Sequence, residues 1–328
     1  MIITGGGIGD IVCLIPLLRK LHADDHRITL IYNGGDPIDQ ILNDQNLLEH
    51  LLIRPSHYRL FRFMLGHLSR FQNALVTHLS DGKMARFVSF ACAKHVIRSA
   101  EQINVKTQHE IAHYLSCFYG ESHAWAADTW GSGWVKNGPR TIPEDYILIQ
   151  PFAGNGKAMY KQWNLERWGK LLAGLHTLFP QLTFVLTGEQ LEEDLFHKLG
   201  STLPVCNKVG KTSLRQLRDL AAHCRGYVGV DTGLMHLVAS YGRPTITIWG
   251  GSNEERFGYH LMDPVAHVII QKKLSCHPCN DWATPNRSRV SSPSRCPDFA
   301  CIRDVTPEEV LHVCNRSISA WLNIAHRS

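Results

Sequence analysis

Short apolar runs rich in Ile, Val and Leu alternate with amphipathic stretches along the whole chain. In the first half, the runs that predict strands lie at 1–4, 27–33, 50–55, 74–80 and 94–100, and helices are expected at 10–23 and 57–71. In the second half, strands are expected at 146–150, 182–188, 226–230, 244–250 and 267–271, and helices at 164–179, 213–224, 232–242 and 306–326. Strands that alternate with helices are typical of an α/β protein with parallel sheets.

The amino-acid composition changes around 130–145, where Gly, Pro and other turn-forming residues predict a linker. A chain of 328 residues is about twice as long as a typical domain. We therefore expect two doubly wound domains, at 1–140 and 141–328. Such a pair of lobes places a ligand cleft between them.

Composition narrows the class of protein. Hydrophobic residues make up 44% of the chain and charged residues 19%, which is ordinary for a globular enzyme. The net charge of +5 suits an anionic ligand or an anionic membrane surface, but it is too weak to predict nucleic-acid binding. The arginines and aromatic residues of 57–71 suit a helix on a membrane surface, and an ordinary amphipathic core helix is the alternative.

No apolar run of about 18 residues is present, and no basic segment precedes the first apolar stretch. The expectation is a cytoplasmic protein, which can work at the inner face of the inner membrane. Its ten cysteines are then expected to be mostly reduced, so a tight group of them predicts a metal site rather than disulfides.

The opening sequence MIITGGGIGD has the form of a nucleotide-binding loop with one change. Gly5 and Gly7 match a dinucleotide fingerprint, but Asp10 stands where the third glycine belongs. A carboxylate at the start of a helix repels phosphate, whereas the helix dipole favours its ionised form. The loop is therefore expected to display a base, and capping of the first helix is the alternative role of Asp10.

The stretch GVDTGLMH predicts an anion site in the second lobe. Asp231 ends a strand, Thr232 and Gly233 form a turn, and the N–H groups of the next helix suit a pyrophosphate. His236 lies one turn later on the same face and can reach a ligand or pack in the core. Lys161 follows a glycine-rich loop at 154–156 and can neutralise a departing diphosphate, or it is simply solvated.

Together these stretches resemble glycosyltransferase family 9, the ADP-heptose:lipopolysaccharide heptosyltransferases. The family has a Gly-Asp pair after its first strand, a PGA…KRW block and a D-T-G-x-x-H-x-x-A…P…G block. These match Gly9-Asp10, PFAGNGKAMYKQW and the segment 231–250, respectively. The chain departs from the pattern at Gly6-Gly7-Ile8, where relatives carry Ser or Thr, and at Gln162 and Asn164 in place of Arg and Pro.

The resemblance implies a GT-B fold, with an N-terminal acceptor lobe, a C-terminal nucleotide-sugar lobe and the active site in the cleft between them. It implies an inverting transfer of heptose from ADP-heptose without a catalytic metal, with Asp10 as general base. It also implies that Lys161 binds the donor diphosphate. The residues that would bind the donor sugar and diphosphate are Asp231, Thr232, Gly233 and His236. The acceptor is a hydroxyl of the lipopolysaccharide inner core or of a protein, and an oligomer is left open.

Four further cysteines, Cys276, Cys279, Cys296 and Cys301, are grouped in a polar insertion at 274–303. Their C-x2-C-x16-C-x4-C spacing fits a tetrahedral four-thiolate site that would replace a small core. Two disulfides or free surface thiols are the alternatives. A similar stretch in the branch of the family that glycosylates autotransporter proteins resembles an iron-binding finger, so structural iron or zinc is expected.

Three functional hypotheses follow from the sequence. The first is a family 9 heptosyltransferase; the others are a nucleotide-sugar-binding or assembly protein with degenerate catalysis, and an enzyme for another nucleotide sugar. An NAD-linked oxidoreductase is disfavoured because Asp10 replaces the third glycine. The second strand also ends in Asn33 rather than in an acidic residue.

Overall fold

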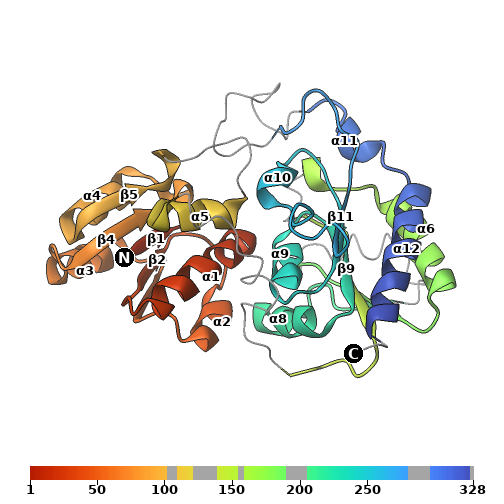
Figure 1. The fold of residues 1–328 in the computed structure, drawn as a ribbon, viewed down its shortest axis with the longest axis horizontal. Coiled ribbons are helices and arrows are strands. Elements are labelled where there is room, and N and C mark those ends of the chain that lie inside the picture. The colour runs from red at the N-terminus through yellow and green to blue at the C-terminus, as the bar shows by residue number, and fades with distance from the viewer. Residues whose placement is uncertain (102–108, 121–138, 154–158, 190–204, 280–295, 326–328) are drawn as a thin grey trace. The chain divides into compact units, whose positions relative to one another are not determined.

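The computed structural model describes residues 1–101, 109–120, 139–153, 159–189, 205–279 and 296–325. It divides the chain into two compact units, Met1–Lys136 and Asn137–Ser328, which Figure 1 shows as ribbons. The expected linker falls largely on residues outside the described ranges. The boundary at 140 and the acceptor and donor roles of the two lobes stay predictions.

Unit 1 is built on a five-stranded parallel sheet in the order β3-β2-β1-β4-β5. Its strands are β1 (Ile2–Thr4), β2 (Thr29–Tyr32), β3 (His50–Ile53), β4 (Phe71–Val76) and β5 (Ala93–Arg98). Its helices are α1 (Ile8–Ala23), α2 (Asp39–Leu42), α3 (His57–Gly66), α4 (Lys83–Cys92) and α5 (Glu110–Tyr119). Because parallel crossovers are right-handed, α1 and α2 lie on one face and α3 and α4 on the other.

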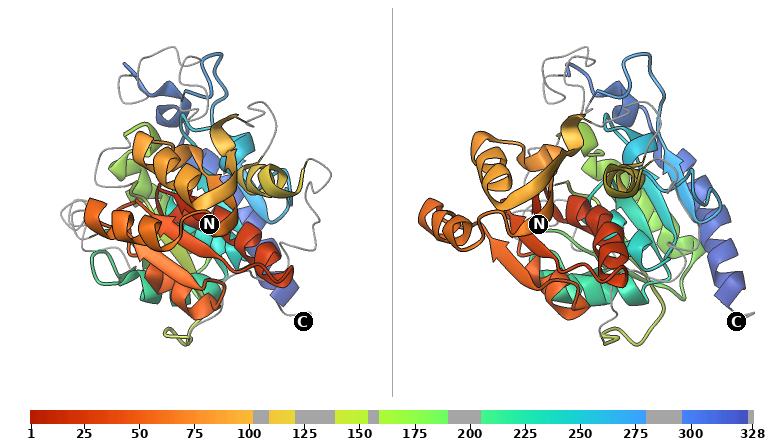
Figure 2. Two further views of the ribbon diagram at one scale, coloured as in Figure 1. Left: turned by 90° about the vertical axis from the view of Figure 1, so that its left-hand side faces the viewer. Right: turned by 60° about the vertical axis from the view of Figure 1, so that its left-hand side comes forward.

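The two faces of this sheet are covered differently. On the first face α1 packs beside α5 and buries nine of its sixteen residues. On the second face α3 contributes Leu60 and Met64, and α4 contributes Val88 and Cys92, to one apolar cluster with the strands. The helices α3 and α4 pack side by side there, and both are drawn in orange in Figures 1 and 2.

Unit 2 is built on a six-stranded parallel sheet in the order β11-β10-β9-β6-β7-β8. Its strands are β6 (Tyr146–Gln150), β7 (Thr183–Leu186), β8 (Cys206–Asn207), β9 (Gly226–Val230), β10 (Thr245–Ile248) and β11 (His267–Ile270). Its helices are α6 (Leu165–Leu178), α8 (Leu214–His223), α9 (Gly233–Ser240), α10 (Glu254–Phe257), α11 (Ala300–Arg303) and α12 (Pro307–Ala325).

The main core of unit 2 lies under α6 and α12, which pack against each other (Figure 1). Trp168 of α6 is fully buried and meets Trp163 edge to face, with 5.2 Å between ring centroids. The indole N–H of Trp163 donates to the backbone carbonyl of Val305 at 2.9 Å, which fixes the chain just before α12. The polar atom of Trp163 is thus satisfied, whereas the buried indole N–H of Trp168 has no hydrogen-bond partner among the described residues.

The expected fold class is confirmed: both units are doubly wound α/β lobes, and every strand expected from the sequence is present. The expected helix 57–71 was too long. It ends at Gly66, because Ser69 adopts a left-handed backbone (φ 53°) and Phe71 already pairs with Ala93 in β5. The expected strand 74–80 begins earlier, at Phe71, and ends at Val76.

The sequence did not predict α4 and α5. Neither has the long apolar stripe that identified α1, and both are only ten residues long. Within the described ranges, the model has no helix that combines the length and the apolar character needed to cross a bilayer.

Each sheet has one point where the strand order reverses. In unit 1 it lies between β1 and β4, and in unit 2 between β6 and β9. In open α/β sheets, ligands bind beyond the carboxyl ends of the strands at such switch points. The loop that carries Asp10 follows β1, and Asp231 follows β9 directly, so both candidate residues lie at a switch point.

Gly226→Ala tests the packing of α12 on the sheet. An added Cβ would lie 2.4 Å from the Trp321 ring and 3.2 Å from the carbonyl of Pro244. Overpacking of this kind costs about 1–3 kcal/mol, so urea unfolding should show a loss of that size. Gly35→Ala is the matched control, since its Cβ meets nothing within 4 Å. An equal loss in both variants would contradict the packing.

Candidate functional site

The unit 2 site is organised around the carboxylate of Asp231, which is only 3% exposed. Its Oδ2 atom lies 2.7 Å from the ammonium of Lys161 and accepts a hydrogen bond from the Ser252 hydroxyl at 2.5 Å. Ser252 in turn is fixed by its backbone carbonyl, which accepts from the Trp249 indole N–H at 2.7 Å. Three separate segments therefore converge on one buried carboxylate.

The electrostatics keep Asp231 ionised. Burial is the largest single influence and would raise the pKa of this carboxyl, and the nearby Lys161 ammonium is the strongest of the groups that lower it. His236 and the Ser252 hydroxyl act in the same direction, and the net pKa of Asp231 is lowered. An ionised carboxylate and an ammonium thus hold each other in place at the carboxyl end of β9.

A close backbone approach brings Lys161 to this place. Lys161 ends a short 3-10 helix at Met159–Lys161, just before α6. An added Cβ on Gly250 would lie 1.8 Å from the Tyr160 carbonyl, and the N–H of Gly251 donates to that same carbonyl at 3.3 Å. Only glycine fits at position 250, so the loop after β10 lies directly against the segment that carries Lys161.

The remaining residues of the DTG motif lie where the sequence predicted a strand-to-helix turn. Thr232 is the N-cap residue of α9, and no side-chain hydrogen bond caps this helix end. Gly233 begins α9. His236 is 5% exposed, and its Nδ1 atom is 2.8 Å from the Tyr259 hydroxyl. In this structure the His236 ring thus packs against Tyr259, and its contact with the donor stays a prediction.

The loop Gly154–Gly156, expected to contribute to the same site, lies outside the described residues. Two contributors were missed by the sequence analysis. Ser252 and Tyr259 follow β10 at a distance, and no motif marks them as neighbours of Asp231 and His236. The position of β10 next to β9 in the sheet is the information that was lacking.

In unit 1, Asp10 lies in the first turn of α1 and is partly exposed. Its Oδ2 atom accepts from the backbone N–H of Gly7 at 2.7 Å. The N-cap residue of α1 is Gly7 and not Asp10, which helps to cap the helix from its third position. Gly6 has a left-handed backbone (φ 82°), and a Cβ there would lie 2.4 Å from the same oxygen. The glycines therefore make room for a carboxylate at this loop.

A second carboxylate, that of Asp36, approaches the same loop. A Cβ built on Gly7 would lie 3.5 Å from Asp36 Oδ2 and 3.9 Å from Asp10 Oδ2. Burial raises the pKa of Asp36, and a hydrogen bond from the Ile8 backbone opposes this. The Tyr32 hydroxyl donates to the Gly6 carbonyl at 2.8 Å and fixes the loop from the end of β2. Asp36 was not expected from the sequence, because no motif relates the residues after the Gly34-Gly35 turn to the first glycine loop.

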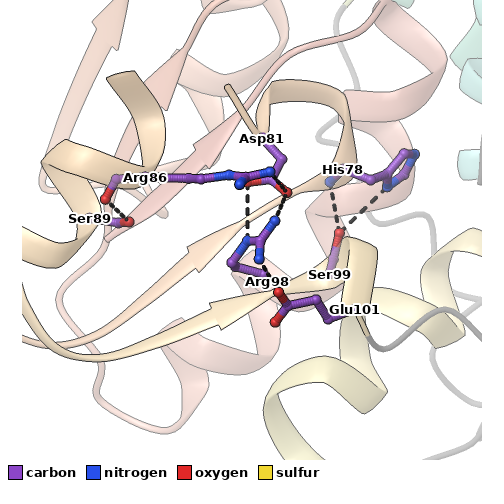
Figure 3. A network of polar contacts seen from close by, with 7 residues as sticks. All are labelled: His78, Asp81, Arg86, Ser89, Arg98, Ser99 and Glu101. Atoms are coloured by element: carbon purple, nitrogen blue, oxygen red, sulfur yellow. Dashed lines mark hydrogen bonds and ion pairs between the residues drawn. The ribbon is translucent and has the colours of Figure 1, made fainter. Parts of the chain in front are cut away.

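The loop after β4 adds a polar network at the same edge of the sheet, drawn in Figure 3. Asp81 pairs with Arg86 at 2.8 Å and with Arg98 at 2.5 Å. Next to it, the Ser99 hydroxyl accepts from the backbone N–H of His78 at 2.8 Å. These contacts tie β4, α4 and β5 together beside the switch point.

A buried acidic residue from α5 lies close by. The Glu110 carboxylate is fully buried and lies 3.8 Å from His78 Nδ1. Burial raises the pKa of Tyr114 far above its usual value, and the charges of Glu110 and Asp10 add to this. The Glu110 carboxylate of α5 thus acts on the same region as Asp10, although no helix was expected here from the sequence.

The thiols of the four cysteines in the insertion influence one another. The pKa of the Cys279 thiol is raised to about 11, first by burial and then by Cys276, Cys301 and Cys296 as neighbouring negative groups. The pKa of Cys301 is also raised to about 11, by burial and then by Cys296 and Cys276. The backbone N–H of Phe299 points at Cys296 Sγ at 3.4 Å.

The chemistry of the donor set, four thiols, fits a thiophilic metal. Even so, among the described residues no three His, Cys, Asp or Glu side chains are arranged to hold an ion. The four-cysteine metal site stays a prediction. His277 has other contacts: its Nε2 atom donates to the Gly250 carbonyl at 2.8 Å, and Nδ1 lies 3.4 Å from the Glu254 carboxylate.

Two doubly wound lobes, each with polar groups at its switch point, define a two-lobed α/β architecture shared by many nucleotide-sugar enzymes. The family model "Glycosyltransferase family 9 (heptosyltransferase)" matches residues 63–288, more than half of the chain. The chain belongs to this family, as the motifs led us to expect. The matched segment contains Lys161 and the segment 231–236, whereas Asp10, Cys296 and Cys301 lie outside it.

Individual relatives are distant. Lipopolysaccharide heptosyltransferase 3 of Escherichia coli is 25% identical over 145 residues, which are 42% of this chain and 41% of that protein. The chain thus spans less than half of the length of the curated relatives that it matches. Lipooligosaccharide heptosyltransferase 2 of Haemophilus influenzae is 31% identical over 101 residues, 29% of each chain.

Solved structures extend the likeness of the fold to nearly the whole chain. The E. coli ADP-heptose LPS heptosyltransferase II matches with a TM-score of 0.68 and 16% identity, over 97% of this chain and 98% of that one. The dodecameric iron-containing heptosyltransferase TibC of enterotoxigenic E. coli matches with a TM-score of 0.58 and 15% identity, over 98% and 77%. These neighbours confirm the GT-B fold class.

Lys161→Met tests the buried ion pair through its pH dependence. In the wild type the lowered pKa of Asp231 stabilises the fold above the unfolded pKa, about 3.9, and this stability is lost as the pH falls through the folded value. Without the ammonium, burial should raise the pKa of Asp231 above 3.9. The variant should therefore be less stable by about 3 kcal/mol at pH 7 and recover stability as the pH falls towards 5.

Urea unfolding at pH 5, 6 and 7 measures this difference. Lys170→Met is the matched control, since Lys170 is an exposed lysine of α6. Lys161→Met/Asp231→Asn should lose the inverted pH dependence. If the Lys161→Met variant loses stability as the pH is lowered, in the same way as the wild type, the role of this pair is refuted.

Proposed function

We propose that this chain is a heptosyltransferase that moves heptose from ADP-heptose to a hydroxyl acceptor with inversion. The observation that carries the proposal is the convergence of Lys161, Asp231 and Ser252 at the unit 2 switch point, inside the segment that matches the family. Fold likeness to an E. coli ADP-heptose LPS heptosyltransferase supports the choice of donor.

The unit 2 site suits the diphosphate of the donor. The α9 helix starts at Gly233 without a side-chain cap, so its first N–H groups are suited to phosphate oxygens. In the proposal, Lys161 neutralises the charge that develops as the diphosphate leaves. Asp231 acts as a positioning residue, because its buried carboxylate would repel a diphosphate and is paired with Lys161 instead. Thr232 and His236 complete the donor site.

Asp10 is the proposed general base. A carboxylate held at a helix N-terminus stays ionised, because the helix dipole and the Gly7 N–H favour its charged form. In the reaction, the acceptor hydroxyl loses its proton to Asp10 while its oxygen attacks the anomeric carbon and ADP departs from the opposite face. No metal is needed for this step.

The acceptor is the lipopolysaccharide inner core in the main form of the proposal, since the curated relatives are named as lipopolysaccharide and lipooligosaccharide heptosyltransferases. Protein hydroxyl groups are the second candidate. The four gathered cysteines favour it, because the fold neighbour TibC is described as an iron-containing heptosyltransferase. If the cysteines hold iron or zinc, the metal would stabilise the fold of the insertion 274–303 and take no part in heptose transfer.

Asp10→Asn tests the base and the donor together. We expect the variant to bind ADP-heptose as the wild type does, because the diphosphate site lies in unit 2. Transfer should fall by about 10²–10⁴-fold, the usual contribution of a general base. Calorimetry with ADP-heptose measures binding, and transfer to heptose-deficient lipopolysaccharide or to acceptor polypeptide measures the reaction and separates the two acceptors.

The controls decide which part of the proposal fails. Asp25→Asn, an exposed change in the turn after α1, should keep full transfer. Lys161→Ala should lose donor binding. A wild type that prefers UDP- or GDP-sugars would refute ADP-heptose but keep the reaction class, and one that binds only NAD would refute both. Unchanged transfer in Asp10→Asn would remove Asp10 from catalysis.

Metal analysis of the purified chain tests the cysteine site. We expect about one iron or zinc ion per chain, and Cys276→Ser should lower this content at least severalfold, since a four-ligand site loses one thiolate. Cys206→Ser is the matched control, because Cys206 is also half-buried but lies in β8. A metal-free wild type, or equal loss in both variants, would contradict the site; thiol titration would then detect disulfides.

A further inference from the structure

The outer surface of α3 and α4, here called the α3–α4 surface, exposes large apolar side chains. Tyr58, Phe61 and Leu65 of α3 are 67%, 52% and 55% exposed, and they recur at the i, i+3 and i+7 spacing of one helix stripe. The stripe is distinct from the buried side of the helix, which carries Leu60 and Met64. The helix expected from the sequence to be either a core helix or a surface helix is thus apolar on both sides.

The neighbouring helix repeats this arrangement. Met84, Phe87 and Phe90 of α4 are 45%, 58% and 66% exposed, whereas Val88 and Cys92 face the core. The two helices pack side by side, and Leu68, just after α3, is 53% exposed. Seven of the eleven large apolar side chains that are exposed in the described structure belong to this one region. Such a concentration marks an interaction surface rather than scattered exposure.

The region is strongly basic. Between Arg54 and Arg98 the sequence contains eight Lys and Arg residues and one carboxylate, Asp81. Figure 3 shows that Asp81 is shared by Arg86 and Arg98. Within the described ranges, the structure records no carboxylate partner for the remaining exposed cations near the two helices: Arg59, Arg62, Arg70, Lys83 and Lys94.

Cations and aromatic rings are also interleaved. The guanidinium of Arg62 lies 5.9 Å from the centroid of the Tyr58 ring. Aromatic residues with a polar tip, and long cationic side chains that extend beyond apolar neighbours, are the groups that suit a lipid headgroup layer. Apolar side chains enter the acyl boundary while the cations remain among the phosphates.

We propose that the α3–α4 surface docks on the headgroup layer of an anionic lipid membrane. The charge excludes the simplest alternative, a symmetric pair of these surfaces in a second copy, because like charges would then face each other. The surface does not depend on the donor or the acceptor, so membrane binding and sugar transfer can fail separately.

Vesicle flotation tests the proposal with the full chain. Vesicles of phosphatidylcholine containing about one third phosphatidylglycerol should carry the protein, and pure phosphatidylcholine vesicles should carry far less. Arg59→Gln/Arg62→Gln/Lys83→Gln should lower partitioning about 100-fold, since each basic residue near an anionic surface contributes about fivefold. Phe61→Ser/Phe87→Ser should also reduce it, and raised salt should weaken the wild type.

Matched variants separate the surface from general charge and hydrophobicity. Lys170→Gln/Lys211→Gln/Arg316→Gln removes the same charge from unit 2, and Leu261→Ser/Val265→Ser removes exposed apolar groups there. Both should float like the wild type, and all variants should keep ADP-heptose binding. No flotation of the wild type, or equal losses in the control variants, would overturn the proposal. Self-association that Phe61→Ser/Phe87→Ser abolishes, without vesicle binding, would also overturn it, in favour of a second copy.

Discussion

The buried carboxylate of Asp231 is the constraint on which the unit 2 site depends. An ionised group with 3% exposure is tolerated only beside a cation and hydrogen-bond donors, and Lys161 and Ser252 supply them. This ion pair also constrains the course of the backbone. The segment that carries Lys161 must lie against the loop after β10, and only glycine at position 250 permits that approach. A requirement of electrostatics thus dictates a contact between two loops that are almost ninety residues apart in the sequence.

Unit 1 also places carboxylates at the switch point of its own sheet. Its glycine loop leaves space for carboxylates, since Gly6 lies against Asp10, and Asp36 approaches Gly7 from the other side. A loop of this shape usually has backbone N–H groups open to phosphate. Here the N–H groups of Gly7 and Ile8 are turned to the side chains of Asp10 and Asp36. The two lobes therefore share a topology but differ at the switch point: an ammonium balances the carboxylate of Asp231 in unit 2, whereas backbone N–H groups meet the carboxylates of Asp10 and Asp36 in unit 1.

The strands, the two lobes and the DTG turn could be predicted from the sequence, because each depends on local periodicity or on a short motif. The residues that were missed depend on sheet order. Ser252 reaches Asp231 only because β10 lies beside β9, and Asp36 reaches the first loop only because β2 lies beside β1. The role of His236 could not be decided from spacing, since a histidine one turn into α9 can face either a ligand or Tyr259. The extent of α3 was overestimated, because the apolar pattern continues past Gly66 into β4 and only the pairing of Phe71 with Ala93 separates them.

The cysteine segment and the donor-type site are linked by backbone contacts, so their structures are not independent. The N–H of Cys279 donates to the carbonyl of Gly251 at 2.8 Å, and His277 donates to the carbonyl of Gly250. The same two glycines lead to Ser252 and contact the Tyr160 backbone beside Lys161. Glu254, the first residue of α10, holds His277 and also lies 3.3 Å from the Lys273 ammonium. The cysteine segment, residues 250–252 and the hydroxyl that supports Asp231 thus form one connected set of contacts. Because packed loops of this kind shift together rather than stretch, the order of the cysteine segment contributes to the geometry of the ion pair.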